Sequence, residues 1–494
     1  MVWQPKPGDK VYRPKREKKY RLRRVLGISS LFSVGYGDVG SSIYYALGIV
    51  ALVAAGATPV ALGIAGILFV ATALTYAEGT SMFPEAGGSA GFARHAFNDT
   101  VGFISGWALM LSYIVTISIS AYTIPPYLGY FWPALKDSPL HGTLFSMGIV
   151  VFLALLNIVG IKESSRVSLT AAVVDIIIQI SILLLGLFFI FNISLVWQRI
   201  TLYWPSPGNF IFGIAMAGVA YTGVESMSQM AEETKKPQVR VPRALILMIV
   251  VVLVLFSGIS LTAFSAMTPA ELAQDWARDP VAGIASAISS SIDPKAISER
   301  WSVDPTTELV IARLIEWFKG LLQPAVSILA ATILLIASNA GLMGSSRLSF
   351  SLGSNKQLPP VLSRTSIFRT PYVAISLFSL IAMALLVPGI KFPGLFENMG
   401  AIYTFASLLA FFIAHFSIIM LRIRQPDAHR PFKLGLNIKI LGRELPVSTL
   451  IGGIGALTVW LVLIVVQPVG RYVGLSWMAI GLAVYFLYRR FGRN

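Results

Sequence analysis

One aspartate, Asp38, stands inside an apolar run that extends from about residue 25 to residue 55. Small residues surround it in the stretch GYGDVGSSIYY, which begins at Gly35. A carboxylate inside a membrane segment is energetically costly, so it is rarely kept without a partner or a function. Secondary transporters build ion and substrate sites where a transmembrane helix is interrupted. We therefore predict a binding site here, with contributions from Asp38, Gly40, Ser41, Ser42 and Tyr45.

A second apolar segment, near residues 208–230, has the same kind of small-residue interruption. It contains Gly218, Thr222, Gly223 and Glu225. Two interrupted segments, five spans apart, are typical of two five-helix repeats with opposite topology. The alternative is close helix packing through small residues. The acidic residue in each interruption favours a functional interpretation, and both carboxyls are candidates for proton coupling.

The fifth apolar segment carries Asp175 and Gln179, one helical turn apart. A protonatable carboxyl in dry surroundings can carry a proton across a membrane, so Asp175 is a third candidate for proton coupling. Hydrogen bonding between packed helices explains the same pattern equally well.

Hydroxyl groups repeat along the third apolar segment. Ser112, Thr116 and Ser120 recur every four residues and therefore share one helix face, next to Tyr113. Such oxygens can replace the water shell of a cation, or they can bond neighbouring helices. Tyr403, in the tenth segment, is a candidate to gate or stack on a substrate, although packing is the simpler explanation.

The elements that position these residues are apolar helices. The chain has 494 residues, of which 55% are hydrophobic and 13% charged, and its mean hydropathy is +0.73. A soluble domain carries about a quarter charged residues, so the sequence indicates an all-α integral membrane protein. About twelve segments reach the ~20 residues needed to cross a bilayer. They lie near 27–54, 59–82, 98–128, 143–160, 168–192, 208–230, 242–266, 322–344, 371–389, 395–421, 446–467 and 470–488.

The charge distribution predicts a multi-pass protein of the plasma (inner) membrane with both termini in the cytoplasm, because most basic residues fall in loops on one side. Residues 1–24 form a basic segment that we expect to lie on anionic lipid. We expect a ten-helix core over 25–425 with an outer loop at 268–320, followed by two more helices within 426–494. The net charge of +16 thus reflects topology and not nucleic-acid binding.

The sequence also excludes several kinds of chemistry. It contains no cysteine, which rules out disulfides, thiol catalysis and cysteine-based metal sites. It has no histidine-rich motif and no nucleophile motif, so we expect a protein that is not an enzyme and that needs no cofactor. The oligomeric state is not predicted.

Five motifs together resemble the amino acid–polyamine–organocation (APC) superfamily of transporters. They are the glycine-rich first span, PEAGG from Pro84, GIKES from Gly160, AEETKKP from Ala231 with VPRA from Val241, and NAGLMGSSR from Asn339. The resemblance covers about residues 27–425. It implies the LeuT-type fold, with inverted repeats of five helices each, broken first and sixth helices, and alternating access.

Two branches of this superfamily compete. One branch consists of potassium–proton symporters of the KimA and KUP type. The positions that hold the ion there correspond in this sequence to Asp38, Tyr45, Tyr113, Thr116, Ser120, Thr222 and Tyr403. The resemblance therefore implies that the candidate potassium ligands are Asp38, Tyr45, Thr116, Ser120 and Thr222. Ser112 stands where that branch has an aspartate. In the amino-acid permeases, backbone N–H groups of the first-span turn bind the substrate carboxylate, and Asp38 would meet an amine. We expect a proton-coupled importer of a small cation, with potassium slightly favoured and an amino acid or polyamine as the alternative.

Overall fold

The computed structural model describes residue 24 and residues 26–85, 87–159, 165–292, 305–368, 370–392, 394–440 and 442–491. The basic segment 1–24 lies almost entirely outside the described residues, as does the GIKES motif.

Within these ranges, eleven helical segments are long and apolar enough to cross a membrane. The first, Ile28–Met82, contains two of the predicted spans, so the segments correspond to the twelve apolar runs of the sequence. The prediction of an all-helical membrane protein is confirmed. The spanning helices are α1 (Ile28–Val39) with α2 (Ile43–Ala54), α3 (Thr58–Met82), α5 (Asp99–Leu128), α7 (Pro139–Val159), α8 (Ser165–Phe189), α10 (Pro207–Ala217) with α11 (Val224–Gln229), α12 (Pro237–Ala266), α16 (Pro305–Ser354), α17 (Tyr372–Leu386), α18 (Leu395–Arg424), α19 (Val447–Val466) and α20 (Pro468–Phe491).

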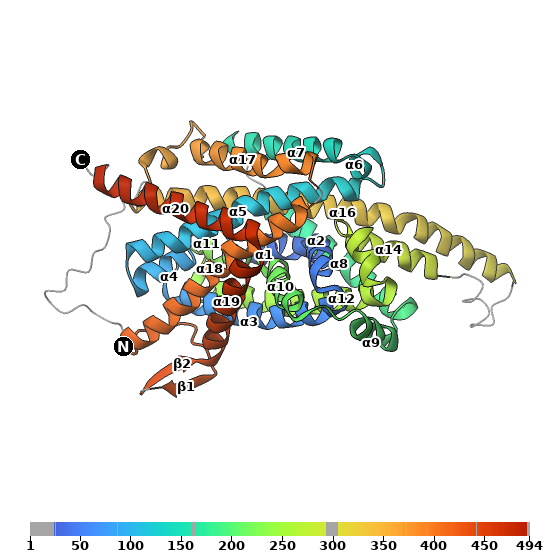
Figure 1. Ribbon diagram of the computed structural model, residues 1–494, viewed down its shortest axis with the longest axis horizontal. Helices are drawn as coiled ribbons and strands as arrows, with labels where there is room; N and C mark the ends of the chain where they lie inside the picture. The colour runs from blue at the N-terminus through green and yellow to red at the C-terminus, as the bar shows by residue number, and fades with distance from the viewer. Residues whose placement is uncertain are drawn as a thin grey trace.

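Helix α5 runs through the middle of the bundle, buried along almost its whole length (Figure 1). It packs against α16 and α18 more extensively than against other helices. Small residues permit this close approach: a Cβ atom at Gly341 of α16 would lie 2.9 Å from the backbone oxygen of Tyr113. A helix that is apolar on all sides belongs in the centre of a bundle, which explains why α5 has little amphipathic character.

The first and sixth spans are both broken, but in different ways. Between α1 and α2, residues Gly40–Ser42 form one turn of 3-10 helix, so the chain keeps its direction. Between α10 and α11, a short 3-10 helix (Gly218–Tyr221) leads into Thr222 with extended backbone and Gly223 with φ +107°. Only glycine adopts that backbone conformation without strain, so Gly223 marks a true interruption of the helix.

Short elements cover the two ends of the bundle (Figure 1). One end carries α4 (Ser89–Ala96) and the antiparallel strands β1 (Asn437–Ile440) and β2 (Arg443–Pro446); we call it the hairpin end. The other end, which we call the α14 end, carries α6 (Ala134–Asp137), α9 (Ile193–Leu202), α13 (Pro269–Gln274) and α14 (Pro280–Ser291). The loop expected at 268–320 therefore holds α13 and α14, and α16 begins inside it.

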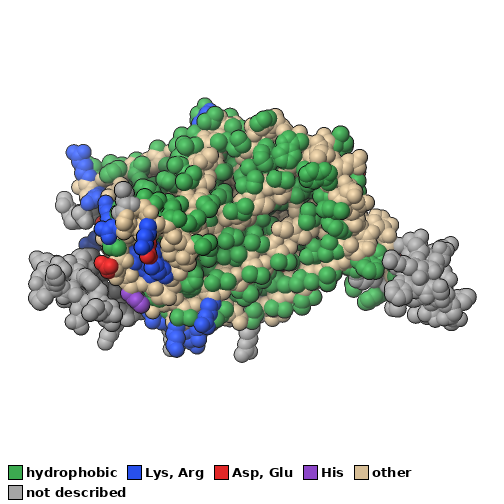
Figure 2. Space-filling view, turned by 90° about the horizontal axis from the view of Figure 1, so that it is seen from below, with side chains coloured by type: hydrophobic (Ala, Val, Ile, Leu, Met, Phe, Trp, Pro, Cys, Tyr) green, Lys and Arg blue, Asp and Glu red, His purple; other side chains and the backbone are tan. Residues whose placement is uncertain are grey.

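The surface separates apolar from basic side chains. Figure 2 shows a broad hydrophobic face, with most of the visible Lys and Arg side chains toward the hairpin end. Large apolar side chains such as Leu184, Val254 and Leu380 are exposed on the spanning helices, as expected for side chains that face lipid tails.

Candidate functional site

Asp38 lies in the last turn of α1 and is 2% exposed. Neither of its carboxylate oxygens has a hydrogen-bond partner among the described residues. Its carboxyl group packs against the break in the sixth span, because a Cβ atom at Gly223 would lie 2.7 Å from the Asp38 Cγ. The unpaired carboxyl of the first span thus meets the interruption of the sixth span.

Three tyrosines and two serines contribute buried hydroxyl groups to this part of the bundle. Tyr45, Tyr113 and Tyr403 lie within electrostatic reach of the Asp38 carboxyl. The hydroxyls of Ser112, Tyr113 and Ser120 are buried and have no hydrogen-bond partner in the described part of the chain. The predicted serine and tyrosine positions on α5 therefore retain unused hydrogen-bonding capacity, which a bound ligand can take up.

Other predicted site residues already bond to one another. Thr116 Oγ1 donates to the Tyr403 hydroxyl at 2.9 Å, and this hydrogen bond joins the third and tenth spans. The hydroxyls of Ser42 and Tyr45 are 3.3 Å apart. Ser41 and Thr222 bond to local backbone oxygens, those of Asp38 and Val219. A potassium ion bound by Tyr45, Thr116 and Thr222 would have to share hydroxyls that serve the structure.

Glu225, in the first turn of α11, also contacts Gly223. Its Oε2 accepts a hydrogen bond from the Gly223 N–H at 3.1 Å, and its side chain is 1% exposed. Glu225 also lies close enough to Asp38 for the two carboxyls to interact electrostatically. The second acidic residue that the sequence singled out is therefore part of the same site.

Asp175, on α8, is buried but has a full set of donors. The hydroxyls of Tyr36 and Tyr44 donate to its two oxygens at 2.8 Å and 2.5 Å, and Gln179 Nε2 donates at 2.6 Å. Tyr36 belongs to α1 and Tyr44 to α2, so one carboxyl connects the two halves of the broken first span. Sequence reasoning missed both tyrosines, although they flank the break.

The α14 end of the site is closed by a loop. Lys136 Nζ lies 2.6 Å from Asp279 Oδ2 and 4.4 Å from the centre of the Trp276 ring. Gly48 of α2 supports this loop, since a Cβ atom there would clash with the backbone oxygen of Ala277. Burial raises the pKa of Asp279 above its ordinary value, against the lowering effect of Lys136.

The hairpin end of the site is closed by backbone pairing. Leu26, just before α1, donates its N–H to Glu233 O and accepts from Lys235 N–H, both at 3.0 Å. Arg347 of α16 adds an ion pair with Glu233 at 3.1 Å. With both ends closed, the structure has an occluded conformation around Asp38.

Two further polar clusters serve the structure. Glu78 is fully buried and binds Arg422 through two hydrogen bonds of 2.7 and 2.6 Å. It also accepts from the Leu434 N–H at 2.9 Å, which ties α3 and α18 to the chain before β1. His415 is buried and bonds to Thr72 and Thr75, so it joins α18 to α3.

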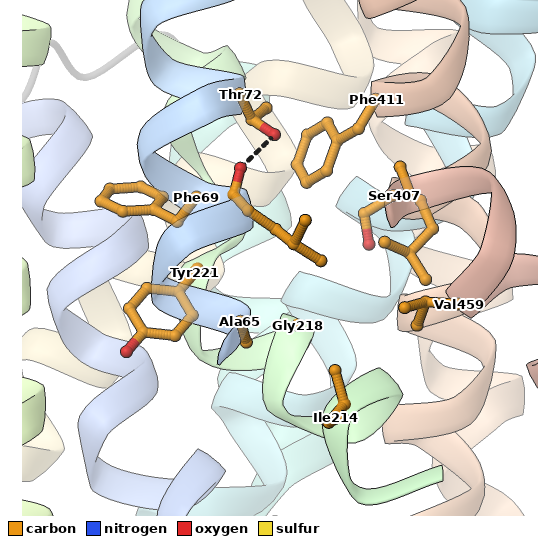
Figure 3. Close-up of a pocket in the computed structure, with 12 residues that line it drawn as sticks. Ala65, Phe69, Thr72, Ile214, Gly218, Tyr221, Ser407, Phe411 and Val459 are labelled. Carbon is orange, nitrogen blue, oxygen red and sulfur yellow. Dashed lines mark hydrogen bonds between the residues drawn. The ribbon is translucent and has the colours of Figure 1, made fainter. Parts of the chain in front are cut away.

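A cavity of about 30 Å³ lies beside the site, between α3, the break in the sixth span, α18 and α19 (Figure 3). Its wall is largely apolar and includes Phe69, Tyr221 and Phe411. The Thr72 hydroxyl, which also lines it, donates a hydrogen bond to the backbone oxygen of Leu68 at 2.8 Å. No charged side chain lines this cavity, so it offers nothing to an ion or an amino acid.

Comparison with known proteins identifies the family. The family model described as amino acid permease matches residues 26–487. The chain is similar to the branched-chain amino acid permease BcaP of Bacillus subtilis (strain 168), with 25% identity over 95% of this chain and 94% of that protein. It is also similar to the glutamate/serine transporter AimA of the same organism, with 26% identity over 96% and 84% of the two chains.

A plant relative is similar as well: the vacuolar cationic amino acid transporter 4 of Arabidopsis thaliana is 25% identical over 85% of this chain and 67% of that protein. These three relatives are amino acid transporters, so they give no support to the expectation of potassium. The chain is a multi-pass membrane transporter and not an enzyme, and it belongs to the amino acid permease family of the APC superfamily.

Proposed function

We propose that this protein imports amino acids together with protons, and that Asp38 binds the ammonium group of the substrate. The observation that carries the proposal is the buried Asp38 carboxyl, both of whose oxygens are unpaired beside the break in the sixth span. An uncompensated carboxylate in a membrane interior is costly, and an ammonium group compensates it. The substrate carboxylate is left to backbone N–H groups of the turn Gly40–Ser42, as the family resemblance implies.

The proposed site also includes the unpaired hydroxyls of Ser112, Tyr113 and Ser120. Its remaining members are Tyr45, Thr116, Thr222 and Tyr403. An amino acid is favoured over potassium because the relatives named above are amino acid transporters. Each hydroxyl can both donate and accept, as the ammonium and carboxylate groups of an amino acid require.

Asp175 is the proposed proton carrier. As a carboxylate it accepts from Tyr36, Tyr44 and Gln179. Once protonated it becomes a donor itself, so one of the tyrosine hydroxyls must reverse its hydrogen bond and accept, or that bond is lost. Because the two tyrosines belong to the two halves of the first span, protonation changes how α1 and α2 are held together, which is the property that a coupled transporter requires.

The proposed orientation places the hairpin end in the cytoplasm and the α14 end outside, in the plasma (inner) membrane. The gathering of Lys and Arg side chains at the hairpin end supports it (Figure 2). In that orientation the Lys136–Asp279 pair closes the outer side and the Leu26–Glu233 pairing closes the inner side.

The test is uptake into proteoliposomes that hold the purified protein, with a panel of labelled amino acids and with ⁸⁶Rb⁺ as the potassium probe, each with and without an inward proton gradient. We expect amino-acid uptake that the gradient stimulates and that Asp38→Asn removes. Asp99→Asn, which changes an exposed carboxyl at the start of α5, is the matched control. If the protein took up Rb⁺ but none of the amino acids, the proposal would be overturned in favour of potassium transport.

A further inference from the structure

The site continues beyond Asp38 toward the hairpin end. Gln229, four residues after Glu225 on α11, is 3% exposed, and neither its amide oxygen nor its amide nitrogen has a partner among the described residues. Tyr76 of α3 is fully buried, and its hydroxyl likewise has no partner there. Buried polar atoms are almost always hydrogen-bonded in proteins, so these groups need an explanation.

Glu225, Gln229 and Tyr76 lie close together. Gly88, with φ +50°, brings the last two near each other: a Cβ atom at Gly88 would lie 3.4 Å from Gln229 Nε2 and 3.6 Å from the Tyr76 ring. Tyr76 in turn lies within electrostatic reach of Glu225. Four residues of α-helix correspond to about 6 Å, so Gln229 is one helical turn from the Asp38–Glu225 pair.

The buried charges of this region do not balance. Asp38 and Glu225 are two carboxyls at one place, and no Lys or Arg side chain pairs with either of them in the part of the chain that the structure describes. The arginines Arg422 and Arg430, whose side chains are 3% and 4% exposed, are both paired with Glu78. Two like charges in a dry site repel each other, and each remains costly until a positive group arrives.

We propose that Glu225, Gln229 and Tyr76 form a second subsite that binds a cationic substrate side chain, so that the protein selects dibasic amino acids such as lysine and arginine. This inference rests on the proposed function, in which Asp38 takes the α-ammonium. The second cationic group then neutralises Glu225, while the amide oxygen of Gln229 and the hydroxyl of Tyr76 accept its remaining hydrogen bonds.

Other substrate classes fit the subsite less well. A branched apolar side chain would leave the Gln229 amide and the Tyr76 hydroxyl buried without partners, which weakens binding. An acidic side chain would add a third negative charge beside Asp38 and Glu225. Only a cationic side chain improves both the charge balance and the hydrogen bonding of these residues.

The experiment measures KM for lysine and alanine uptake in proteoliposomes, with leucine and glutamate as further substrates. We expect lysine to have a KM at least tenfold lower than leucine, and glutamate not to be taken up. Glu225→Gln should raise the ratio of the lysine KM to the alanine KM about tenfold, because it removes one charge pair. Gln229→Leu should raise the same ratio by a smaller factor.

Two further variants guard against a simple folding defect. Gln229→Glu adds a negative charge at the same place and should lower the lysine-to-alanine KM ratio, an effect that no loss of folded protein can produce. Gln357→Leu is the matched control, because Gln357 is an equally buried amide that bonds elsewhere, to the Asp99 backbone oxygen. It should leave the ratio unchanged.

The outcomes separate this inference from the function on which it rests. If leucine, serine or glutamate is taken up in preference to lysine, or if Glu225→Gln changes the lysine and alanine KM values equally, the second subsite is refuted while amino-acid transport stands. If no amino acid is taken up by correctly folded protein, the proposed function fails, and this inference fails with it.

Discussion

Asp38 and Asp175 are both aspartates buried in spanning helices, yet their surroundings are opposite. Asp38 has no hydrogen-bond partner for either oxygen among the described residues, whereas Asp175 accepts from Tyr36, Tyr44 and Gln179. An unsatisfied buried carboxyl is suited to gain a ligand, and a fully satisfied one is suited to hold helices together. In the proposed function, the same residue type binds substrate in one place and carries the proton in the other.

The largest expected difference concerns substrate affinity. Asp38→Asn should weaken substrate binding about 10- to 100-fold, because a charge-assisted hydrogen bond contributes about 1.5–3 kcal/mol. Asp175→Asn should change affinity by less than about threefold, but it should flatten the dependence of uptake on the proton gradient. Initial rates of uptake against substrate concentration, at several external pH values, measure both effects. Equal losses of affinity in the two variants would break the comparison.

The next test changes the backbone on which Asp38 rests. Gly223→Ala should cost about 1–3 kcal/mol, the range for a strained backbone, because Gly223 has φ +107° and a methyl group there would meet the Asp38 carboxyl. We expect a lower unfolding temperature and no uptake. Gly208→Ala is the control, since nothing lies within 4 Å of a Cβ atom at that position. Unchanged uptake by Gly223→Ala would show that Asp38 is not confined by the sixth span.

A smaller effect is expected at Asp175. Tyr36→Phe and Tyr44→Phe should each destabilise the protein by about 1 kcal/mol, the usual contribution of one hydrogen bond. Because both hydroxyls bond to the same carboxyl, the double variant should depart from additivity by about 0.5 kcal/mol or more. Thermal unfolding of the four proteins in detergent provides this measurement. Strict additivity would mean that Asp175 does not join the two halves of the first span.

The smallest effect belongs to a carboxyl outside the spans, which provides a baseline for both aspartates. Glu85 bonds to Arg94 at 2.7 Å and to His95 at 3.1 Å. Burial raises the pKa of Glu85, but His95 and Arg94 outweigh it and hold that pKa below its ordinary value. The folded state therefore gains stability from ionised Glu85 above about pH 4.3, the ordinary value for Glu, and loses it as the pH falls further.

Since Glu85 is partly exposed, solvent screens the pair and the gain is at most about 0.5 kcal/mol. Glu85→Gln should lower the unfolding temperature slightly at pH 7 and not at pH 3. A larger loss at low pH than at neutral pH would contradict the sign of this argument.

Sequence patterns predicted the local features of the site. The breaks in the first and sixth spans were predicted from glycines, because helix interruption is a property of adjacent residues. The candidates Asp38 and Glu225 were predicted from charge in an apolar run, and in the structure both contact Gly223. The two breaks nevertheless differ, since Gly40 remains helical and only Gly223 has a positive φ.

The partners of these residues could not be predicted. Tyr36 and Tyr44 are 139 and 131 residues from Asp175, and Arg422 is 344 residues from Glu78. Hydrophobic periodicity identifies the buried face of a helix but not the helix that it meets. For the same reason no sequence pattern singled out Tyr76 and Gln229, whose polar atoms are buried without partners among the described residues. The choice of potassium depended on individual positions, and the relatives do not support it.

The central claim is that Asp38 holds the substrate ammonium while Asp175 does not touch the substrate. Equilibrium binding of labelled lysine to the purified protein, compared among the unaltered protein, Asp38→Asn and Asp175→Asn, tests it most directly. Alanine serves as a second ligand, which keeps the test independent of side-chain preference. The account predicts that Asp38→Asn binds both amino acids about 10- to 100-fold more weakly and that Asp175→Asn retains their binding. Unchanged binding in Asp38→Asn would contradict the account.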